Sequence, residues 1–245
     1  MAPASGTLPS VWERRDGAEE KLVHLGWQRV AATSCLLWGV GCGPARAEAG
    51  GRDASEVLSR LQGWVTATRD LRCRFDQTLV SGALGTGIHE AGVLYVKRPG
   101  RLRWDYTEPE SKIALLVGDR MTLYLPDERQ LLRGTSAQGS SALSDLLAAR
   151  SKLDELFKAT LVATPEVGGE GAYRIRLVPR ASAEGVEEVT ITTRPPEFGI
   201  EAAEVLDGLG NRTRFRFKSQ RRNRGVSEEL FHFEPPPGTE IVDQP

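Results

Sequence analysis

The segment Gly92-Val-Leu-Tyr-Val-Lys-Arg-Pro-Gly-Arg-Leu-Arg-Trp-Asp-Tyr106 decides the fold of this chain. It holds two apolar runs interleaved with polar residues, and Arg98-Pro99-Gly100 separates them. Alternation with a period of two predicts strands, and a Pro-Gly pair between two strands predicts a tight turn. The segment therefore predicts two antiparallel neighbours, over 88–97 and 101–107, in a sheet with one wet face.

The same pattern extends in both directions along the chain. Short runs with strand character alternate with Gly, Pro and Asp signals such as Gly118-Asp119 and Asp207–Asn211. Spacers this short favour antiparallel pairing over helical crossovers. We predict further strands over 71–79, 112–117, 120–125, 129–133, 173–177, 189–191, 200–206, 213–217 and 229–233.

Two segments have helical rather than strand spacing. Residues 53–68 place apolar side chains on one face, with Asp53 or Ser55 available as a cap, and residues 142–158 carry two leucine stripes. The fold class is thus mainly β with a few short helices. A single wide sheet with helices on one face must curl around them or close on itself.

The first 47 residues have the features of an export signal. An apolar stretch over 30–43 follows Arg29, is too short to span a bilayer comfortably, and precedes the small-x-small pair Ala45 and Ala47. We expect cleavage after Ala47 and a flexible leader over 48–54. The mixed charges of residues 1–28 suggest that translation starts further along, near Leu22, Val23 or Leu25. An alternative reading makes Cys42 a lipidated cysteine, although the usual leucine of such a site is missing.

No pattern of catalytic residues is present. The chain lacks a nucleophile elbow, a Walker loop and a dinucleotide fingerprint, and its three histidines are scattered. Cys73 is the one cysteine beyond the signal region, so neither an internal disulfide nor a metal cluster is expected. We expect no enzymatic activity, no catalytic residue, no metal and no cofactor.

Nucleic acid is also not an expected ligand. The net charge is −1, so the whole chain creates no attractive field for phosphates. Arg101 and Arg103 interleave with Leu102, Trp104 and Tyr106, but alternation places these arginines on the face opposite the aromatic rings. Stacking and phosphate contacts would therefore not converge.

Two motifs resemble those of one family, the outer-membrane lipoprotein carrier (LolA) family. The first is the Gly92–Tyr106 segment, which is similar to the family's G-x-L-x-V-K-R-P-x-x-x-x-W pattern. The second is Phe231-x-Phe233-x-Pro235-Pro236-x-Gly238, which resembles its C-terminal F-x-F-x-P-P-x-G signature. With Phe75-x-Gln77, the resemblance spans residues 55–245, which we take as one domain.

The resemblance implies an unclosed antiparallel half-barrel covered by a lid of short helices, with an apolar cavity between them. It also implies a periplasmic, monomeric carrier of lipoprotein acyl chains, which receives lipoproteins from an inner-membrane ABC exporter and delivers them to an outer-membrane receptor. Arg98 occupies the position of the arginine that holds the lid closed in the family. The expected cavity residues are Phe75, Leu102, Trp104 and Tyr106, and the expected lid residues are Leu58, Leu61, Trp64, Val65, Leu146, Leu147, Leu153 and Phe157.

Two alternatives remain open on the sequence. A membrane-anchored lipoprotein receptor with a similar half-barrel would require an acylated Cys42. A lipid-sensing interaction domain on the same fold would bind lipid without carrying lipoproteins.

Overall fold

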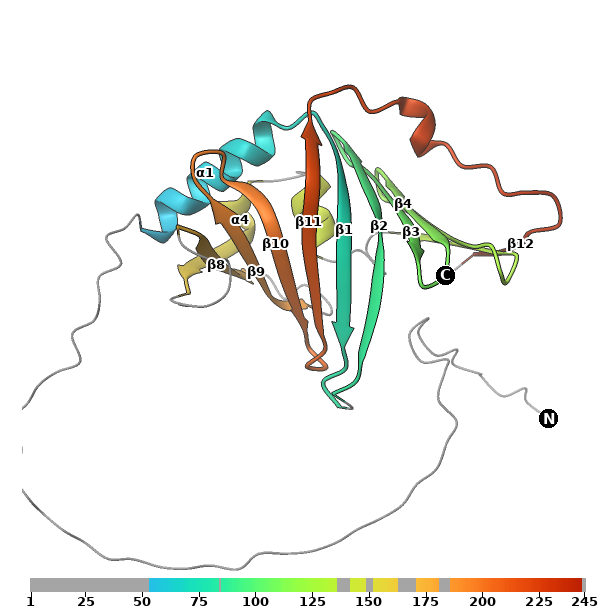
Figure 1. Ribbon diagram of the computed structural model, residues 1–245, viewed down its shortest axis with the longest axis horizontal. Coiled ribbons are helices and arrows are strands. Elements are labelled where there is room, and N and C mark those ends of the chain that lie inside the picture. The colour runs from blue at the N-terminus through green and yellow to red at the C-terminus, as the bar shows by residue number, and fades with distance from the viewer. Residues whose placement is uncertain are drawn as a thin grey trace, which may run out of the picture. The chain divides into compact units, whose positions relative to one another are not determined.

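The structure is a computed structural model that describes residues 53–83, 85–135, 142–148, 152–162, 171–180 and 186–243. The chain divides into residues 1–47 and 48–245, and every described residue belongs to the second unit. The expected signal region, Cys42, the cleavage site and most of the leader therefore lie outside the described residues. Figure 1 shows the described elements.

A twelve-stranded sheet forms the body of the domain, in the order β12-β6-β5-β4-β3-β2-β1-β11-β10-β9-β8-β7. All pairs are antiparallel except β12 with β6. Because β12 and β7 are the two ends of this order and do not pair, the sheet is unclosed, which confirms the predicted fold class. Its strands are β1 (Asp70–Val80), β2 (Gly87–Lys97), β3 (Arg101–Glu108), β4 (Lys112–Val117), β5 (Arg120–Leu125), β6 (Gln130–Thr135), β7 (Phe157–Leu161), β8 (Tyr173–Pro179), β9 (Val186–Arg194), β10 (Gly199–Asp207), β11 (Arg212–Arg222) and β12 (Glu240–Asp243).

Helix α1 (Ala54–Ala67) forms where helical spacing predicted it. Asp53 caps it, because its carboxylate accepts a hydrogen bond of 2.8 Å from the Glu56 amide. At the other end, Thr68 leaves the helical conformation and its hydroxyl donates to the Trp64 carbonyl at 2.7 Å. The helix is thus ended at both termini by side chains that satisfy its unpaired backbone groups.

Two shorter helices, α3 (Ala142–Ala148) and α4 (Leu153–Leu156), occupy the predicted region over 142–158. The prediction is wrong for the last part of this region, because Phe157 is the first residue of strand β7. Its amide donates back to Leu153 and so ends α4, while the Arg180 amide donates to the Leu156 carbonyl at 2.8 Å beside β8. Phe157 pairs with a strand that is distant in the sequence, β8, and a local pattern cannot indicate such a pairing. This pairing outweighs the preference of the local sequence for a helix.

The helices reveal the curvature of the sheet. Helix α3 contacts β2 and β3 on one side and β9 and β10 on the other, and α1 contacts β7, β8 and β10. Strands β3 and β9 are separated by four others in the sheet order, so they reach one short helix only if the sheet bends around it. We call the helix side the concave face and the other side the outer face.

The C-terminal segment differs from the prediction. Residues 229–233 were expected to be a strand, but Glu228–Phe231 form a 3-10 helix, η1, capped by Ser227. Phe231 is buried and Phe233 packs on Tyr124 with ring centroids 5.0 Å apart. The alternation of these two phenylalanines therefore reflects packing on the outer face rather than strand pairing.

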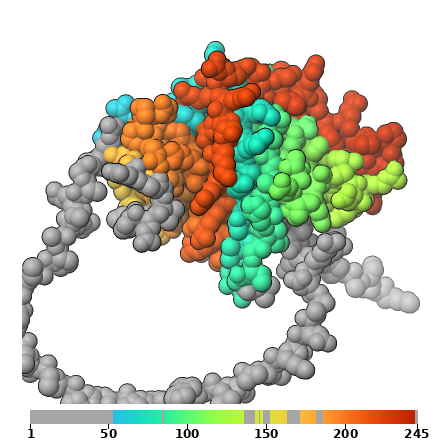
Figure 2. Space-filling view, in the orientation of Figure 1, coloured from blue at the N-terminus to red at the C-terminus, as the bar shows by residue number. Residues whose placement is uncertain are grey.

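Charged contacts hold η1 in that place. Arg103 donates to the Leu230 carbonyl at 2.9 Å, and Glu228 forms ion pairs with Lys97 and Arg101. The Lys97 ammonium, helped by Arg101, lowers the pKa of Glu228 below its usual value. Beyond η1 the chain crosses to the sheet edge, where β12 pairs with β6 (Figures 1 and 2).

Candidate functional site

An aromatic group covers the middle of the concave face. Strands β1 and β3 contribute Phe75 and Trp104, whose rings meet edge to face at 4.8 Å, and Tyr106 lies 5.0 Å from Phe75. Phe215 and Phe217 of β11 approach Trp104 at 5.4 and 6.3 Å. We call these five rings the aromatic floor. They come together because residues two apart on a strand share a face.

The expected cavity residues thus lie side by side. Phe75, Leu102 and Trp104 are buried in one cluster, and Tyr106 packs against it half-buried. The list drawn from the sequence missed Phe215 and Phe217. Their signal was visible as the Thr213-Phe215-Phe217 alternation, but only the pairing of β1 with β11 places them beside Phe75.

The expected lid residues cover this face. Those of α1 (Leu58, Leu61, Trp64, Val65), of α3 (Leu146, Leu147) and of α4 (Leu153) all belong to the same buried cluster as the floor. A hydrogen bond of 2.7 Å from the Leu153 amide to the Gln62 side chain joins α4 to α1. Phe157 is buried in this cluster too, but as part of the sheet.

Arg98 lies at the turn after β2 and reaches the end of α1. Its Nη1 donates to the carbonyl of Val65, in the last turn of the helix. That carbonyl is at the negative end of the helix dipole, which favours a cation. Burial lowers the pKa of Arg98 to about 10, and its Nε has no hydrogen-bond partner among the described residues.

A row of four polar side chains crosses the same concave face, and sequence reasoning did not single it out. Gln77 donates to Glu90 at 3.0 Å, Tyr106 donates to Gln77 at 3.1 Å, and Lys112 forms an ion pair with Glu90. The Lys112 ammonium also lies 4.4 Å from the Tyr106 ring centroid. Burial, and then the nearby Glu90 charge, raise the pKa of Tyr106. We call these four residues the polar ladder.

Within the described segments, no three His, Cys, Asp or Glu side chains gather as a metal site would require. A search of the same segments finds no helix long and apolar enough to cross a membrane. The concave face of the described residues is thus mainly a surface for apolar contact, to which the ladder and Arg98 add polar groups.

Comparison with known proteins identifies the family. The sequence profile described as "Outer membrane lipoprotein carrier protein LolA" matches residues 66–234, more than half of the chain. The chain belongs to the LolA family.

Two relatives show how similar this chain is in sequence to other members of the LolA family. The outer-membrane lipoprotein carrier protein of Methylobacillus flagellatus is 28% identical over 192 residues, which is 78% of this chain and 90% of the relative. That of Dechloromonas aromatica is 28% identical over 190 residues, or 77% and 88%. A solved LolA superfamily protein from Nitrosomonas europaea aligns with a TM-score of 0.44 and 12% identity, covering 75% of this chain and 99% of that one.

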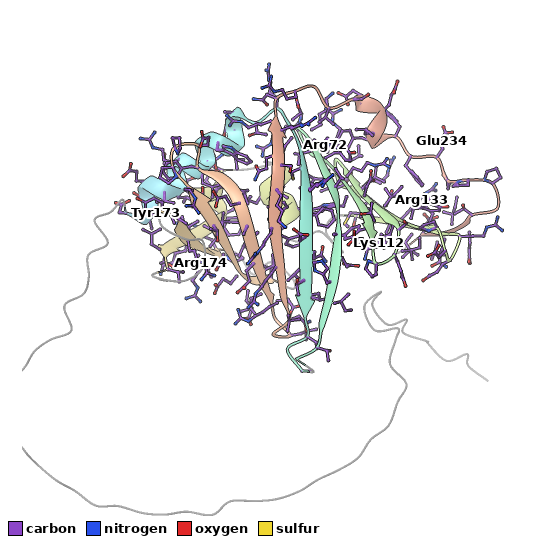
Figure 3. The ribbon with its side chains drawn as sticks, in the orientation of Figure 1. Arg72, Lys112, Arg133, Tyr173, Arg174 and Glu234 are labelled. Atoms are coloured by element: carbon purple, nitrogen blue, oxygen red, sulfur yellow. The ribbon has the colours of Figure 1, made fainter. Side chains whose placement is uncertain are left out.

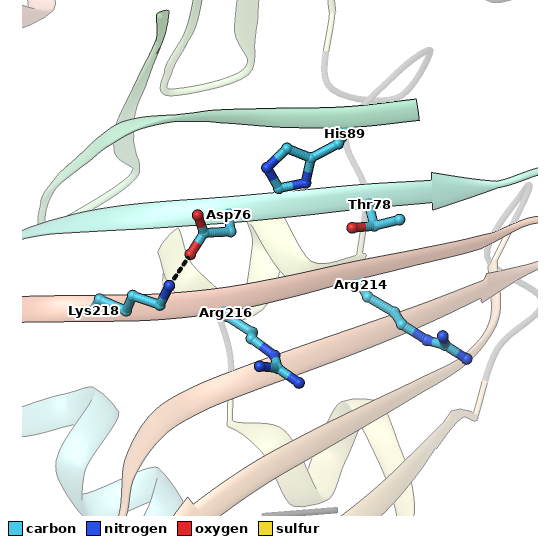
Figure 4. Close-up of a pocket in the computed structure, with 6 residues that line it drawn as sticks. All are labelled: Asp76, Thr78, His89, Arg214, Arg216 and Lys218. Carbon is cyan, nitrogen blue, oxygen red and sulfur yellow. Dashed lines mark ion pairs between the residues drawn. The ribbon is translucent and has the colours of Figure 1, made fainter. Parts of the chain in front are cut away.

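The outer face of this LolA-family domain is polar where the C-terminal segment leaves it uncovered. A pocket over β1, β2 and β11 is lined by Asp76, Thr78, His89, Arg214, Arg216 and Lys218 (Figure 4). Lys218 pairs with Asp76 at 2.7 Å, and Arg214 pairs with Glu204 of β10 at 2.5 Å. Arg214 and Arg216 alternate with Phe215 and Phe217 along β11, so these arginines lie on the face opposite the aromatic floor.

Proposed function

We propose that this protein is a periplasmic carrier that binds the acyl chains of lipoproteins on its concave face and carries lipoproteins from the inner to the outer membrane. Membership of the LolA family and the carrier names of its relatives support this function. The observation that carries the proposal is one continuous buried apolar cluster, contributed by both the sheet and the helices. The partners would be an inner-membrane ABC exporter and an outer-membrane receptor.

The energetics of acyl chains explain why a carrier is needed. Each buried methylene is worth about 0.8 kcal/mol, so three chains of about fifteen methylenes would cost on the order of 36 kcal/mol in water. Free diffusion of a lipoprotein across an aqueous gap is thus excluded. A protein that covers this surface by apolar contacts between movable helices and a sheet reduces the cost and can still release the cargo.

The helices must move before cargo enters. Leu61, Leu102 and Leu146 are at most 1% exposed, so the apolar face is covered in this conformation. Cargo binding then exchanges contacts between lid and sheet for contacts between acyl chain and sheet. Arg98 would act as the latch of this lid, since it joins the turn after β2 to the last turn of α1.

The test is release of lipoproteins from spheroplasts of the natural host. Purified protein should release lipoproteins into the supernatant in proportion to its amount, as measured by immunoblotting or mass spectrometry. Trp104→Arg should abolish release, because it places a charge in the aromatic floor. Arg216→Ala, on the outer face, is the matched control and should release as much as the wild type. A supernatant free of lipoproteins at every concentration would refute the carrier function.

Native mass spectrometry of protein from the natural host separates the carrier from the anchored receptor. A carrier cleaved after Ala47 starts at Glu48 without modification and leaves residues 55–245 as the working domain, preceded by a short leader. A chain that starts at an acylated Cys42 would instead identify an anchored receptor.

A further inference from the structure

The polar ladder lies at the margin of the apolar surface. Its residues come from β1, β2, β3 and β4, and directly paired positions bring Gln77 opposite Glu90 and Tyr106 opposite Lys112. Toward the interior, the next concave positions are Phe75 and the buried cluster. In the other direction, toward solvent, the next pair is Leu79 with Ile88. Leu79 is half-buried and Ile88 is 56% exposed. At this margin the ladder, which shares Tyr106 with the aromatic floor, therefore lies between Phe75 and solvent.

Stability alone does not account for these side chains. Glu90 is 9% exposed and Gln77 4% exposed, so both are withdrawn from water beside the buried apolar cluster. A buried ion pair roughly balances its desolvation cost, and apolar residues of similar volume often stabilise as well or better. Four polar groups on four adjacent strands thus need another reason to be there.

Their chemistry fits the part of a lipoprotein where acyl chains join the polypeptide. That linkage contains ester carbonyls, which only accept hydrogen bonds, and amide groups, which also donate. The Lys112 ammonium and the Tyr106 hydroxyl are donors, the Glu90 carboxylate is an acceptor, and the Gln77 amide is both. An acyl chain lying on the aromatic floor places its carbonyl end at the margin, where the ladder is. Lys112 lies on β4, among the green strands of Figure 3.

We propose that Gln77, Glu90, Tyr106 and Lys112 form a subsite that binds the ester and amide linkage of the cargo's lipid anchor. The proposal rests on the carrier function proposed above. In the closed protein the ladder residues satisfy one another, and in the loaded protein they exchange these bonds for bonds to the linkage. The subsite would set how deep the chains enter and would select acylated peptides over simple hydrocarbons.

Two synthetic lipopeptides test the subsite. One carries an N-acyl, S-diacylglyceryl cysteine with ester linkages, and the other replaces both esters by ethers without changing chain length. The wild type should bind the ester form at least about tenfold more tightly, because hydrogen bonds to charged groups are the stronger ones. Binding is measured by titration below the critical micelle concentration, with displacement of a fluorescent lipid as the readout.

The double variant Glu90→Gln/Lys112→Met removes both charges together, so no unpaired buried charge remains to unfold the protein. It should lose most of the preference for the ester form and keep only the part, about threefold, that the Tyr106 hydroxyl contributes. Tyr106→Phe, which removes only a hydroxyl, should lower the preference for the ester by about threefold. Lys218→Met, on the outer face, is the matched control and should keep the full preference.

The outcomes separate the two proposals. If neither lipopeptide binds the wild type, the carrier function itself fails. If both bind with equal affinity, the carrier function stands and the subsite is overturned. A folded double variant that keeps the full preference also overturns the subsite, because the two charges then do not recognise the ester. A folded double variant that loses both ligands alike overturns it too, because the ladder then acts only on the shape of the site.

Discussion

A guanidinium at the end of a helix is favoured because the last carbonyl groups there lack partners within the helix. Arg98 uses this property to join the turn after β2 to α1 through the Val65 carbonyl. The same side chain is partly desolvated, which lowers its pKa to about 10. If the lid opens as proposed, the hydrogen bond between Arg98 and Val65 must break.

Cys73 provides a probe for this contact. It is 1% exposed within the cluster that α1 helps to bury, and burial raises its pKa to about 12. Since the thiolate is the reactive form, labelling by a thiol reagent at pH 8 requires the cluster to open. Arg98→Leu should increase the labelling rate by about threefold to tenfold, the effect of one lost hydrogen bond, with an unchanged circular dichroism spectrum.

Arg103→Leu is the matched control for this prediction. Arg103 also donates to a backbone carbonyl, that of Leu230, but on the outer face. Its loss should leave the labelling rate of Cys73 unchanged. Equal rates for the wild type and Arg98→Leu would show that Arg98 does not restrain α1.

At the scale of the element, strand β2 depends on the absence of one side chain. A Cβ on Gly92 would overlap the Asp105 carbonyl of β3 and come within 2.9 Å of its carbon. The register between β2 and β3 shifts between Ala91 and Gly92, so a bulge brings the two backbones close together there. This is the physical reason for the glycine that begins the deciding segment.

Gly92→Ala should lower the free energy of unfolding by about 1–3 kcal/mol, because the backbone of β3 must shift. Gly63→Ala is its counterpart in α1, where no atom lies within 4 Å of the added Cβ. It should raise the free energy of unfolding by about 0.5–1 kcal/mol, since alanine loses less backbone entropy in a helix. Denaturant titration measures both, and a stable Gly92→Ala variant would contradict the close approach of β2 and β3.

At the scale of the whole molecule, the sheet and the lid have different roles. Strands β1, β2 and β11 pair over their full lengths in the middle of the sheet, whereas α1 and α3 meet the sheet through side chains. Cargo should therefore displace the helices before it disturbs the central strands.

Hydrogen exchange with mass spectrometry tests this division. Saturation with the ester-linked lipopeptide should increase exchange in α1 and α3 and leave the amides of β1 and β11 protected. The same peptide without its lipid is the control and should change neither. Increased exchange across β1 and β11 would show that the sheet, rather than the lid, opens.

Local pattern determined much of this protein. Alternation of side chains places a residue on one face or the other before any tertiary contact exists. Most of the strands, the separation of arginines from aromatics, and α1 with its Asp53 cap could therefore be predicted. The expected apolar site residues share one buried cluster, and Tyr106 lies against it.

What remained depended on residues distant in the chain. The start of β7 at Phe157 needs β8, the edge strand β12 needs β6, and η1 needs the outer face of β3. The polar ladder was hidden for the same reason, because Gln77, Glu90 and Lys112 are unremarkable until three neighbouring pairings place them beside Tyr106. Periodicity states which face a side chain occupies, and only the folded sheet decides which side chains it meets there.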